Sequence, residues 1–184
     1  MSKNIWFTSD WHLGHKNILK LSNRPFSTIE EHDEIIINNI NKFVKNSDDL
    51  YILGDISFNQ SYNTYKNIFN RLKGNKYIIW GNHDNKNQLI KCQKEGLLVS
   101  VRESQILNID KYTIHLTHYP LREFFNFYNG GYHFYGHCHG NIDDYCKSTD
   151  VSVDCWEFEP VEFYELKEYI DKNCEDNIHP QYVY

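Results

Sequence analysis

Alanine is absent from this chain of 184 residues, whereas Asn, Ile and Lys are abundant. That bias indicates an AT-rich coding sequence and says nothing about function. The chain also lacks any run of about 18 apolar residues, so we expect no transmembrane helix. Its first residues lead directly into a strand-like segment, without the pattern of a signal peptide. We therefore expect a soluble protein that stays in the cytoplasm.

Paired cysteines and a surplus of basic charge are missing as well. The five cysteines are scattered and include no Cys-x-x-Cys pair, which favours reduced thiols over a disulfide framework. The formal net charge of −6 lowers the expectation of a general nucleic-acid binder. This charge is unevenly spread, because residues 143–176 carry a net −9 and the rest of the chain a net +3. The argument against polyanionic partners thus applies mainly to the C-terminal segment.

What the chain does contain is enough apolar sequence for one globular domain. Hydrophobic residues make up 40% of it and aromatic residues 16%, and no repeat or linker divides it. We expect a single domain over residues 1–184, with an acidic segment from about residue 143 and no cap domain.

Strand and helix patterns alternate in the first half of the sequence. Compact apolar runs predict buried strands at 4–8, 50–53 and 77–80, and helical spacing predicts helices over 28–45 and 62–72. The second half predicts strands at 97–101, 104–109, 112–117, 132–135 and 150–155, then a short helix at 164–169. This order is typical of a layered α/β fold whose site lies at the carboxyl ends of the strands.

Polar clusters follow these strands. They are Asp10-Trp11-His12, Gly54-Asp55, Gly81-Asn82-His83-Asp84, His118-Tyr119-Pro120 and Gly136-His137-Cys138-His139-Gly140. A capping aspartate or a turn explains several of them individually. Two imidazoles between glycines are harder to explain structurally, and imidazole is a favoured ligand for Zn, Fe, Ni and Cu. The joint occurrence of the clusters therefore indicates a metal site.

The order of these clusters resembles the calcineurin-like metallophosphoesterase family, whose five motifs are matched over residues 10–139. Residues 9–15, the tripeptide 24–26 and residues 151–154 are similar to its small bacterial and phage members. The resemblance implies a four-layer αββα sandwich of two mixed β-sheets flanked by helices. It also implies residence in the cytoplasm of a bacterium or of a phage-infected host cell.

The resemblance further implies a centre of two divalent metal ions bridged by Asp55. One ion would be completed by Asp10, His12 and His139, and the other by Asn82, His118 and His137. This mixed nitrogen and oxygen shell without thiolate favours Mn, with Fe, Zn and Ni as alternatives, over a structural zinc site. Cys138 lies between two of these residues, but alternation along the chain should point it away.

Such a centre suits a phosphate ester, because two divalent ions outweigh the charge of Asp10 and Asp55. In the mechanism that the resemblance implies, metal-bound hydroxide attacks phosphorus in line and His83 protonates the leaving group as general acid. Asp84 would orient His83 and favour its charged form. We predict a phosphodiesterase rather than a monoesterase, because a poor alkoxide leaving group requires that proton. Candidate substrates are nucleotides, cyclic nucleotides and nucleic-acid ends, so nucleic acid would enter only as a substrate.

Two alternatives stay open. The chain could be a catalytically silent metal-binding scaffold of the same fold, although such scaffolds tend to lose ligands and this set is complete. It could also be a metal-dependent nuclease, which would need a basic track leading to the site. The sequence leaves the oligomeric state open.

Several side chains near the motifs have no role that the sequence assigns. His15 could reach the phosphate or face solvent, and His133 could support the site from behind. Positive side chains could grip the substrate, and these are Lys16, Arg24 and Arg122. We expect His32 on the surface and His115 packed on the strand face opposite His118. For Tyr119 and the aromatic residues of 124–128, core packing is favoured over a role as cleft walls.

Overall fold

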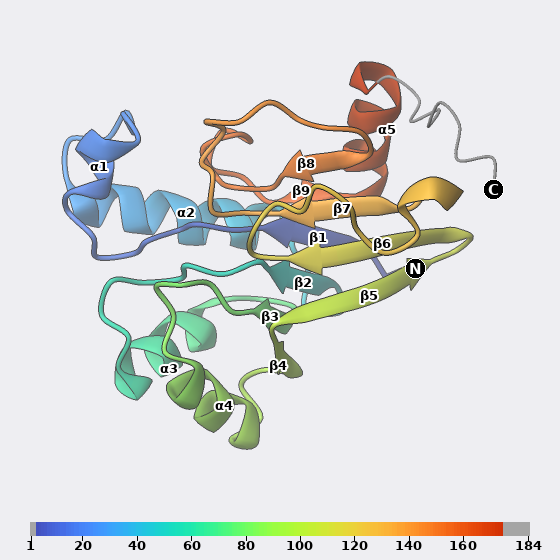
Figure 1. Ribbon diagram of the computed structural model, residues 1–184. Helices are drawn as coiled ribbons and strands as arrows, with labels where there is room; N and C mark the ends of the chain where they lie inside the picture. The colour runs from blue at the N-terminus through green and yellow to red at the C-terminus, as the bar shows by residue number, and fades with distance from the viewer. Residues whose placement is uncertain (1–2, 175–184) are drawn as a thin grey trace.

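The first of two β-sheets organises the N-terminal half of the computed structural model, which describes residues 3–174 (Figure 1). Its strand order is β4-β3-β2-β1-β9. The strands β1 (Ile5–Thr8), β2 (Asp49–Ile52), β3 (Asn75–Ile79) and β4 (Ser100–Arg102) are parallel, and β9 (Val161–Glu162) runs antiparallel to β1. Parallel neighbours bring the carboxyl ends of β1, β2 and β3 to one edge of the sheet.

Three helices cover one face of this sheet. They are α2 (Ile29–Phe43), α3 (Tyr62–Arg71) and α4 (Lys86–Lys94). Thr28 begins α2 as its N-cap, accepting a hydrogen bond from the backbone N–H of Glu31. The apolar stripe of α2, with Ile36 and Ile40, packs in one core with Leu50 and Ile52 of β2. This core fixes the sheet from behind and leaves its edge free for the site.

The second sheet packs on the opposite face, in the order β5-β6-β7-β8. Its strands are β5 (Ser104–Ile109), β6 (Tyr112–Thr117), β7 (Tyr132–Tyr135) and β8 (Ser148–Asp150). Only β5 and β6 pair antiparallel, so this sheet is also mixed. Alternate side chains of both sheets interdigitate, as in the edge-on contact of Phe7 and Phe134 with ring centroids 4.9 Å apart.

Helix α5 (Phe163–Asn173) closes this inter-sheet core with Phe163, Leu166 and Ile170. The outer face of the second sheet is covered differently. There Phe124 stacks on His133 at 5.0 Å, next to the short 3-10 helix η1 (Phe127–Asn129). The short helix α1 (Ile18–Leu21) lies beyond the carboxyl end of β1, at the left of Figure 1. The expected architecture of two mixed sheets flanked by helices is confirmed.

One predicted strand is wrong, one helix was not predicted, and the strand expected at 97–101 spans Ser100–Arg102. The alternating segment 150–155 is not a strand, because β8 ends at Asp150 and turns follow. Its alternation has another cause: Val151 packs between the sheets, whereas Val153 packs in the core under the helices. Helix α4 was not predicted, since it buries only Leu89 and Cys92 and so shows almost no apolar stripe.

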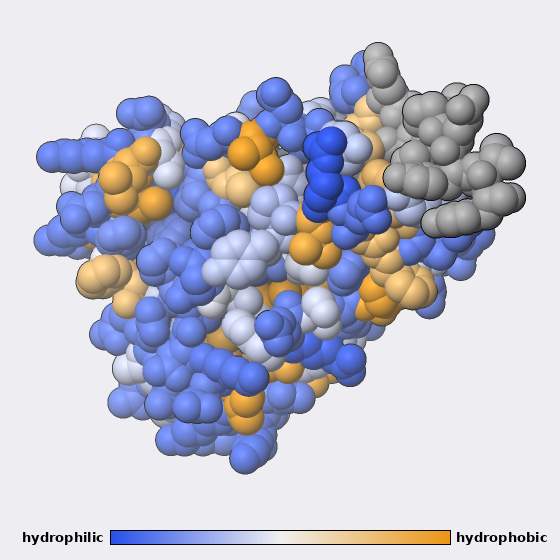
Figure 2. Space-filling model, viewed as in Figure 1, coloured by the Kyte–Doolittle hydropathy of each residue, from blue (hydrophilic) through white to orange (hydrophobic). Residues whose placement is uncertain are grey.

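The molecular surface is mainly hydrophilic on the face that Figure 2 shows. None of the helices within residues 3–174 combines the length and the apolar composition that crossing a bilayer requires.

Candidate metal centre

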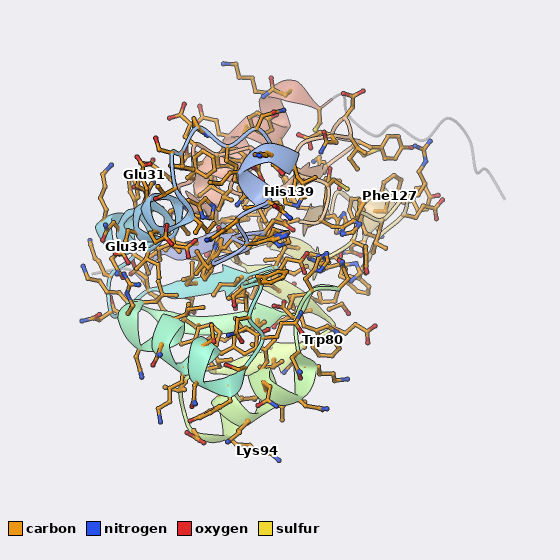
Figure 3. The ribbon with its side chains drawn as sticks, turned by 90° about the vertical axis from the view of Figure 1, so that its left-hand side faces the viewer. Glu31, Glu34, Trp80, Lys94, Phe127 and His139 are labelled. Atoms are coloured by element: carbon orange, nitrogen blue, oxygen red, sulfur yellow. The ribbon has the colours of Figure 1, made fainter. Side chains whose placement is uncertain are left out.

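The polar clusters of the sequence meet at one end of the two sheets. Asp10 and His12 follow β1, Asp55 follows β2, Asn82 follows β3, and the remaining three predicted ligands follow β6 and β7. Backbone hydrogen bonds tie these loops together, from Asp10 N to Gly54 O (3.0 Å) and from His12 N to Asp55 O (2.9 Å). Figure 3 looks onto this end, with His139 beside α1 and Trp80 on the side of α3 and α4.

Asp10, His12 and His139 form the first group that could hold a metal ion. Oδ1 of Asp10 lies 4.0 Å from Nε2 of His12 and 3.7 Å from Nε2 of His139. The other oxygen of Asp10 accepts hydrogen bonds from the Ser9 hydroxyl (2.6 Å) and the His137 N–H (2.8 Å).

This first group fits a cation. Oδ1 of Asp10 and Nε2 of His12 are buried and have no hydrogen-bond partner among the described residues. Buried polar atoms without partners are costly, and a bound cation would satisfy both. Carboxylate oxygen and imidazole nitrogen are donors that Mn, Fe, Zn and Ni accept.

Asp55, His118 and His137 form the second group. Oδ1 of Asp55 lies 3.6 Å from Nε2 of His118. Asn82 joins them, since its Oδ1 is 2.9 Å from Nε2 of His118 and 3.0 Å from Nδ1 of His137. Asn82 and His137 are exposed, whereas Asp10 and His12 of the first group are buried. Asn82 and His137 therefore form the solvent-facing side of the second group, whose Asp55 and His118 are buried.

The backbone at these ligands is strained. Asp10, His12, Asp55, His137 and His139 all have positive φ, between 51° and 73°. Non-glycine residues seldom adopt this region, at a cost of roughly 1–3 kcal/mol each, unless the surroundings impose it. Such strain concentrates at functional sites, where it aims side chains that a regular strand would send to opposite faces.

Because they lack a side chain, two glycines of the motifs make room for the carboxylates of Asp55 and Asp10. A Cβ at Gly81 would lie 2.1 Å from Oδ1 of Asp55, and one at Gly136 would lie 2.5 Å from Oδ2 of Asp10. The glycines thus belong to the site because no larger residue fits beside its carboxylates.

Burial dominates the electrostatics of the first group. It raises the pKa of Asp10 to about 7 and lowers the pKa of His12 to about 2. Desolvation penalises the charged form of each side chain. His12 is thereby kept as the neutral imidazole, which is the form that binds a metal.

Asp154 and Arg24 hold His139 from behind. Nδ1 of His139 is 2.6 Å from Oδ2 of Asp154, and Arg24 reaches both oxygens of that carboxylate at 2.8 and 2.6 Å. The Arg24 side chain is fully buried and also donates to the carbonyl oxygens of Asp10 and Trp11. Of the candidates for gripping substrate, Arg24 is therefore excluded, because its donors are used inside the protein.

The sequence did not assign Asp154 to the site, although segment 151–154 was noted for its resemblance to the family's small members. His32 was also misplaced, because it is buried and its Nε2 lies 2.8 Å from Nη1 of Arg24. Its Nδ1 meets Asp33 at 2.8 Å. The helical stripe of α2 contained His32, and this position could have indicated burial.

Asp84 has partners other than the expected one. Its carboxylate accepts hydrogen bonds from the N–H groups of Asp55 (2.9 Å), Ile56 (3.1 Å) and Gly81 (2.9 Å) and from the Tyr65 hydroxyl (3.2 Å). None of the hydrogen bonds within residues 3–174 joins it to the imidazole of His83. The expectation that Asp84 orients His83 is corrected: it joins the loop after β2 to the loop after β3.

His83 lies at the solvent side of the ligands. Its backbone N–H donates to Oδ1 of Asp55 over 2.9 Å, and its exposed ring lies 5.5 Å from that of His12. His15 stacks on Phe58 with centroids 4.8 Å apart, and its ring lies 5.8 Å from that of His12.

The other undecided residues lie away from the ligands. His133 is buried and bonds the hydroxyls of Thr117 and Ser148, both at 2.8 Å. Arg122 lies over the ring of Tyr145 at 3.9 Å. His115 accepts a hydrogen bond from the backbone of Phe125. Phe124 and Phe127 are buried, as core packing predicts, whereas Phe125 and Tyr119 are exposed.

The profile of the calcineurin-like phosphoesterase family matches residues 3–141 of the chain. The chain belongs to this family. An uncharacterised protein of Methanocaldococcus jannaschii is 31% identical over 179 residues, which are 92% of this chain and 93% of that protein. The gene 66 protein of Mycobacterium phage L5 is 36% identical over 83 residues, 44% of this chain and 40% of that protein.

A solved structure of a protein of unknown function from Aquifex aeolicus shares the fold. It superposes with a TM-score of 0.69 at 23% identity, covering 92% of this chain and all of that one. Members of this phosphoesterase family are metal-dependent, and the two Asp/His groups are consistent with a dinuclear centre.

Proposed function

We propose that this phosphoesterase is a dinuclear metal-dependent phosphodiesterase. The observation that carries the proposal is the position of Asp55, whose Oδ2 lies 3.6 Å from Nε2 of His12 while its Oδ1 lies 3.6 Å from Nε2 of His118. A carboxylate between two sets of ligands can bridge two cations. Asp10, His12 and His139 would complete one ion, and Asn82, His118 and His137 the other.

When bound, two divalent ions supply a water of lowered pKa as the nucleophile and neutralise charge on the phosphoryl oxygens. The donor set suits Mn first, with Fe, Zn and Ni as alternatives. The chain's own residues set the geometry: strained backbones fix Asp10 and Asp55, and Asp84 fixes the loops that carry Asp55 and Asn82.

His83 is the proposed general acid. The hydrogen bond from its backbone to Asp55 fixes its position next to the bridging carboxylate, and its imidazole reaches solvent. An imidazolium there can donate its proton to the ester oxygen as the phosphorus–oxygen bond breaks. This step matters for any alkoxide leaving group. Because Asn82 and His137 are exposed, the centre is open to a bulky ester, and we propose a diester substrate such as a nucleotide, a cyclic nucleotide or a nucleic-acid end.

The test compares two kinds of leaving group. Purified Mn²⁺-loaded protein should hydrolyse an activated aryl diester, and we expect it to prefer this to the aryl monoester. His83→Ala should keep both metals yet lose about 10²–10⁴-fold in turnover of an alkyl diester, and lose less on the aryl diester, whose leaving group needs no proton.

His15→Ala is the matched control, because it removes an imidazole near His12 that stacks on Phe58. It should change turnover far less than His83→Ala. Protein that binds two metals but hydrolyses neither ester would overturn the proposal and favour a silent scaffold.

A further inference from the structure

A pocket of about 380 Å³ opens directly beside the second metal-binding group. It shares Asn82 and His118 with that group, and Trp80, Tyr119 and Leu121 supply its apolar walls. The pocket lies where the loop after β3, the link between β4 and β5, and the end of β6 meet. A phosphate held at the metal centre would therefore direct one of its ester arms into this pocket.

The pocket offers a ring for stacking. Tyr119 is 50% exposed, and its ring contacts His137 edge-on with centroids 4.6 Å apart. The Thr117 hydroxyl donates to the carbonyl oxygen of Tyr119 over 2.6 Å, which fixes the backbone there. Lys86 covers the ring of Trp80 at 4.2 Å, so of these two pocket residues Tyr119 is the one whose ring a ligand can stack on. Stacking of a planar base on such a ring tolerates any base, because every base has a π-face.

The polar groups of the pocket specify the charge of its ligand. Apart from the histidines His115 and His118, Glu103 is the only acidic or basic residue among those that line it. Neither Glu103 nor the hydroxyl of the neighbouring Ser104 has a hydrogen-bond or ion-pair partner within residues 3–174. Burial lowers the pKa of His115, so this wall residue is neutral and does not offset the carboxylate. An uncharged group with N–H or O–H donors suits the Glu103 side of this wall, whereas a phosphate placed against that carboxylate would be repelled.

We infer that this pocket receives the terminal nucleoside of a phosphodiester, an arm that carries a base and sugar but no further phosphate. The inference rests on the proposed function, because the phosphate at the metal centre anchors the arm. It narrows the substrate to a diester cleaved next to a free nucleoside end, and it excludes the interior of a nucleic-acid strand.

The first experiment measures binding of adenosine 5′-monophosphate and of inorganic phosphate to Mn²⁺-loaded His83→Ala protein by titration calorimetry. We expect the nucleotide to bind about tenfold or more tightly than phosphate, through the stacked base. Tyr119→Ala in the same background should remove that difference and leave phosphate binding unchanged. Tyr164→Ala is the matched control, because Tyr164 is 51% exposed but contacts Asp110 at the far end of β6.

The second experiment uses adenosine 3′,5′-bisphosphate, which adds one phosphate to the same nucleoside. It should bind more weakly than the monophosphate, and Glu103→Gln should strengthen its binding several-fold without changing that of the monophosphate. Glu30→Gln, an exposed carboxylate at the start of α2, should change neither.

Equal binding of nucleotide and phosphate, or tighter binding of the bisphosphate by the parent protein, would overturn the inference. Because these are binding measurements on protein that lacks the proposed general acid, they do not depend on hydrolysis. A protein that fails to cleave the aryl diester yet shows this binding pattern would refute the proposed function alone.

Discussion

Nδ1 of His139 donates a hydrogen bond of 2.6 Å to Oδ2 of Asp154. A carboxylate can only accept, so this contact places a proton on Nδ1 and turns Nε2 towards Oδ1 of Asp10, 3.7 Å away. Although burial opposes it, the hydrogen bonds from His139 and Arg24 lower the pKa of Asp154 to about 2. The pair thus fixes both the tautomer and the direction of one predicted metal ligand.

Asp154→Asn should weaken the first metal site about 10- to 100-fold, because loss of such a supporting carboxylate has this effect on metal affinity. The second group has no contact with Asp154 and should still bind. Metal content measured after dialysis against limiting Mn²⁺ should fall from two ions per chain towards one. Asp171→Asn, a surface aspartate paired with Lys167 on α5, is the control. Two ions retained at wild-type affinity would contradict this role for Asp154.

Gly81→Ala should disrupt the centre while leaving the fold intact. The added Cβ would meet Oδ1 of Asp55 at 2.1 Å and must displace that carboxylate, which is the proposed bridge between the two metals. We expect binding of both metals to weaken and turnover to fall by about 100-fold or more, as misplacement of about 1 Å can do. Gly96→Ala is the control, since its Cβ meets nothing within 4 Å although its φ of +79° carries some strain. It should lower stability slightly and leave metal content unchanged.

Asp84→Asn distinguishes a structural role from a catalytic one. An amide offers one oxygen where the carboxylate offers two, so backbone N–H groups of the two loops lose their acceptor. We expect a loss of about 2 kcal/mol or more in the free energy of unfolding, measured by denaturant titration. The pH profile of turnover should keep its shape. A shifted acidic or basic limb with unchanged stability would instead restore Asp84 as the partner of His83.

His133 should make the metal-free protein sensitive to acid. Burial, with a smaller effect from His115, lowers its pKa from 6.5 to about 3. Below pH 6.5 the unfolded chain binds this proton and the folded chain does not, so the group costs about 1.4 kcal/mol of stability per pH unit down to about pH 3. His133→Gln can still bond Thr117 and Ser148. Between pH 6.5 and 4.5 it should reduce the acid-induced loss in the free energy of unfolding by about 1.4 kcal/mol per pH unit. Denaturant midpoints at each pH measure it, and parallel curves for the two proteins would contradict the assignment.

The local sequence pattern predicts most helices and strands, but not the segments whose conformation depends on tertiary packing. Strands β1 and β2 carry compact apolar runs and β6 alternates apolar with polar residues, so their positions follow from the residues themselves. The strand expected at 150–155 failed because Val151 and Val153 serve two different cores, which produces the same alternation as a strand face. Helix α4 has no such pattern in its sequence, because a helix at the rim needs only two buried residues.

The sequence by itself determined which residues meet. Parallel strands bring their carboxyl ends to one edge, so the side chains that follow β1, β2 and β3 converge in the first sheet and those that follow β6 and β7 converge in the second. The stacking of the two sheets then brings these two edges together. Only the tertiary structure decided what holds them. Arg24 binds Asp154 across 130 positions of the chain, and Asp84 joins two loops rather than orienting His83. A buried polar group takes whichever partner the packing brings within about 3 Å, and no local spacing encodes that partner.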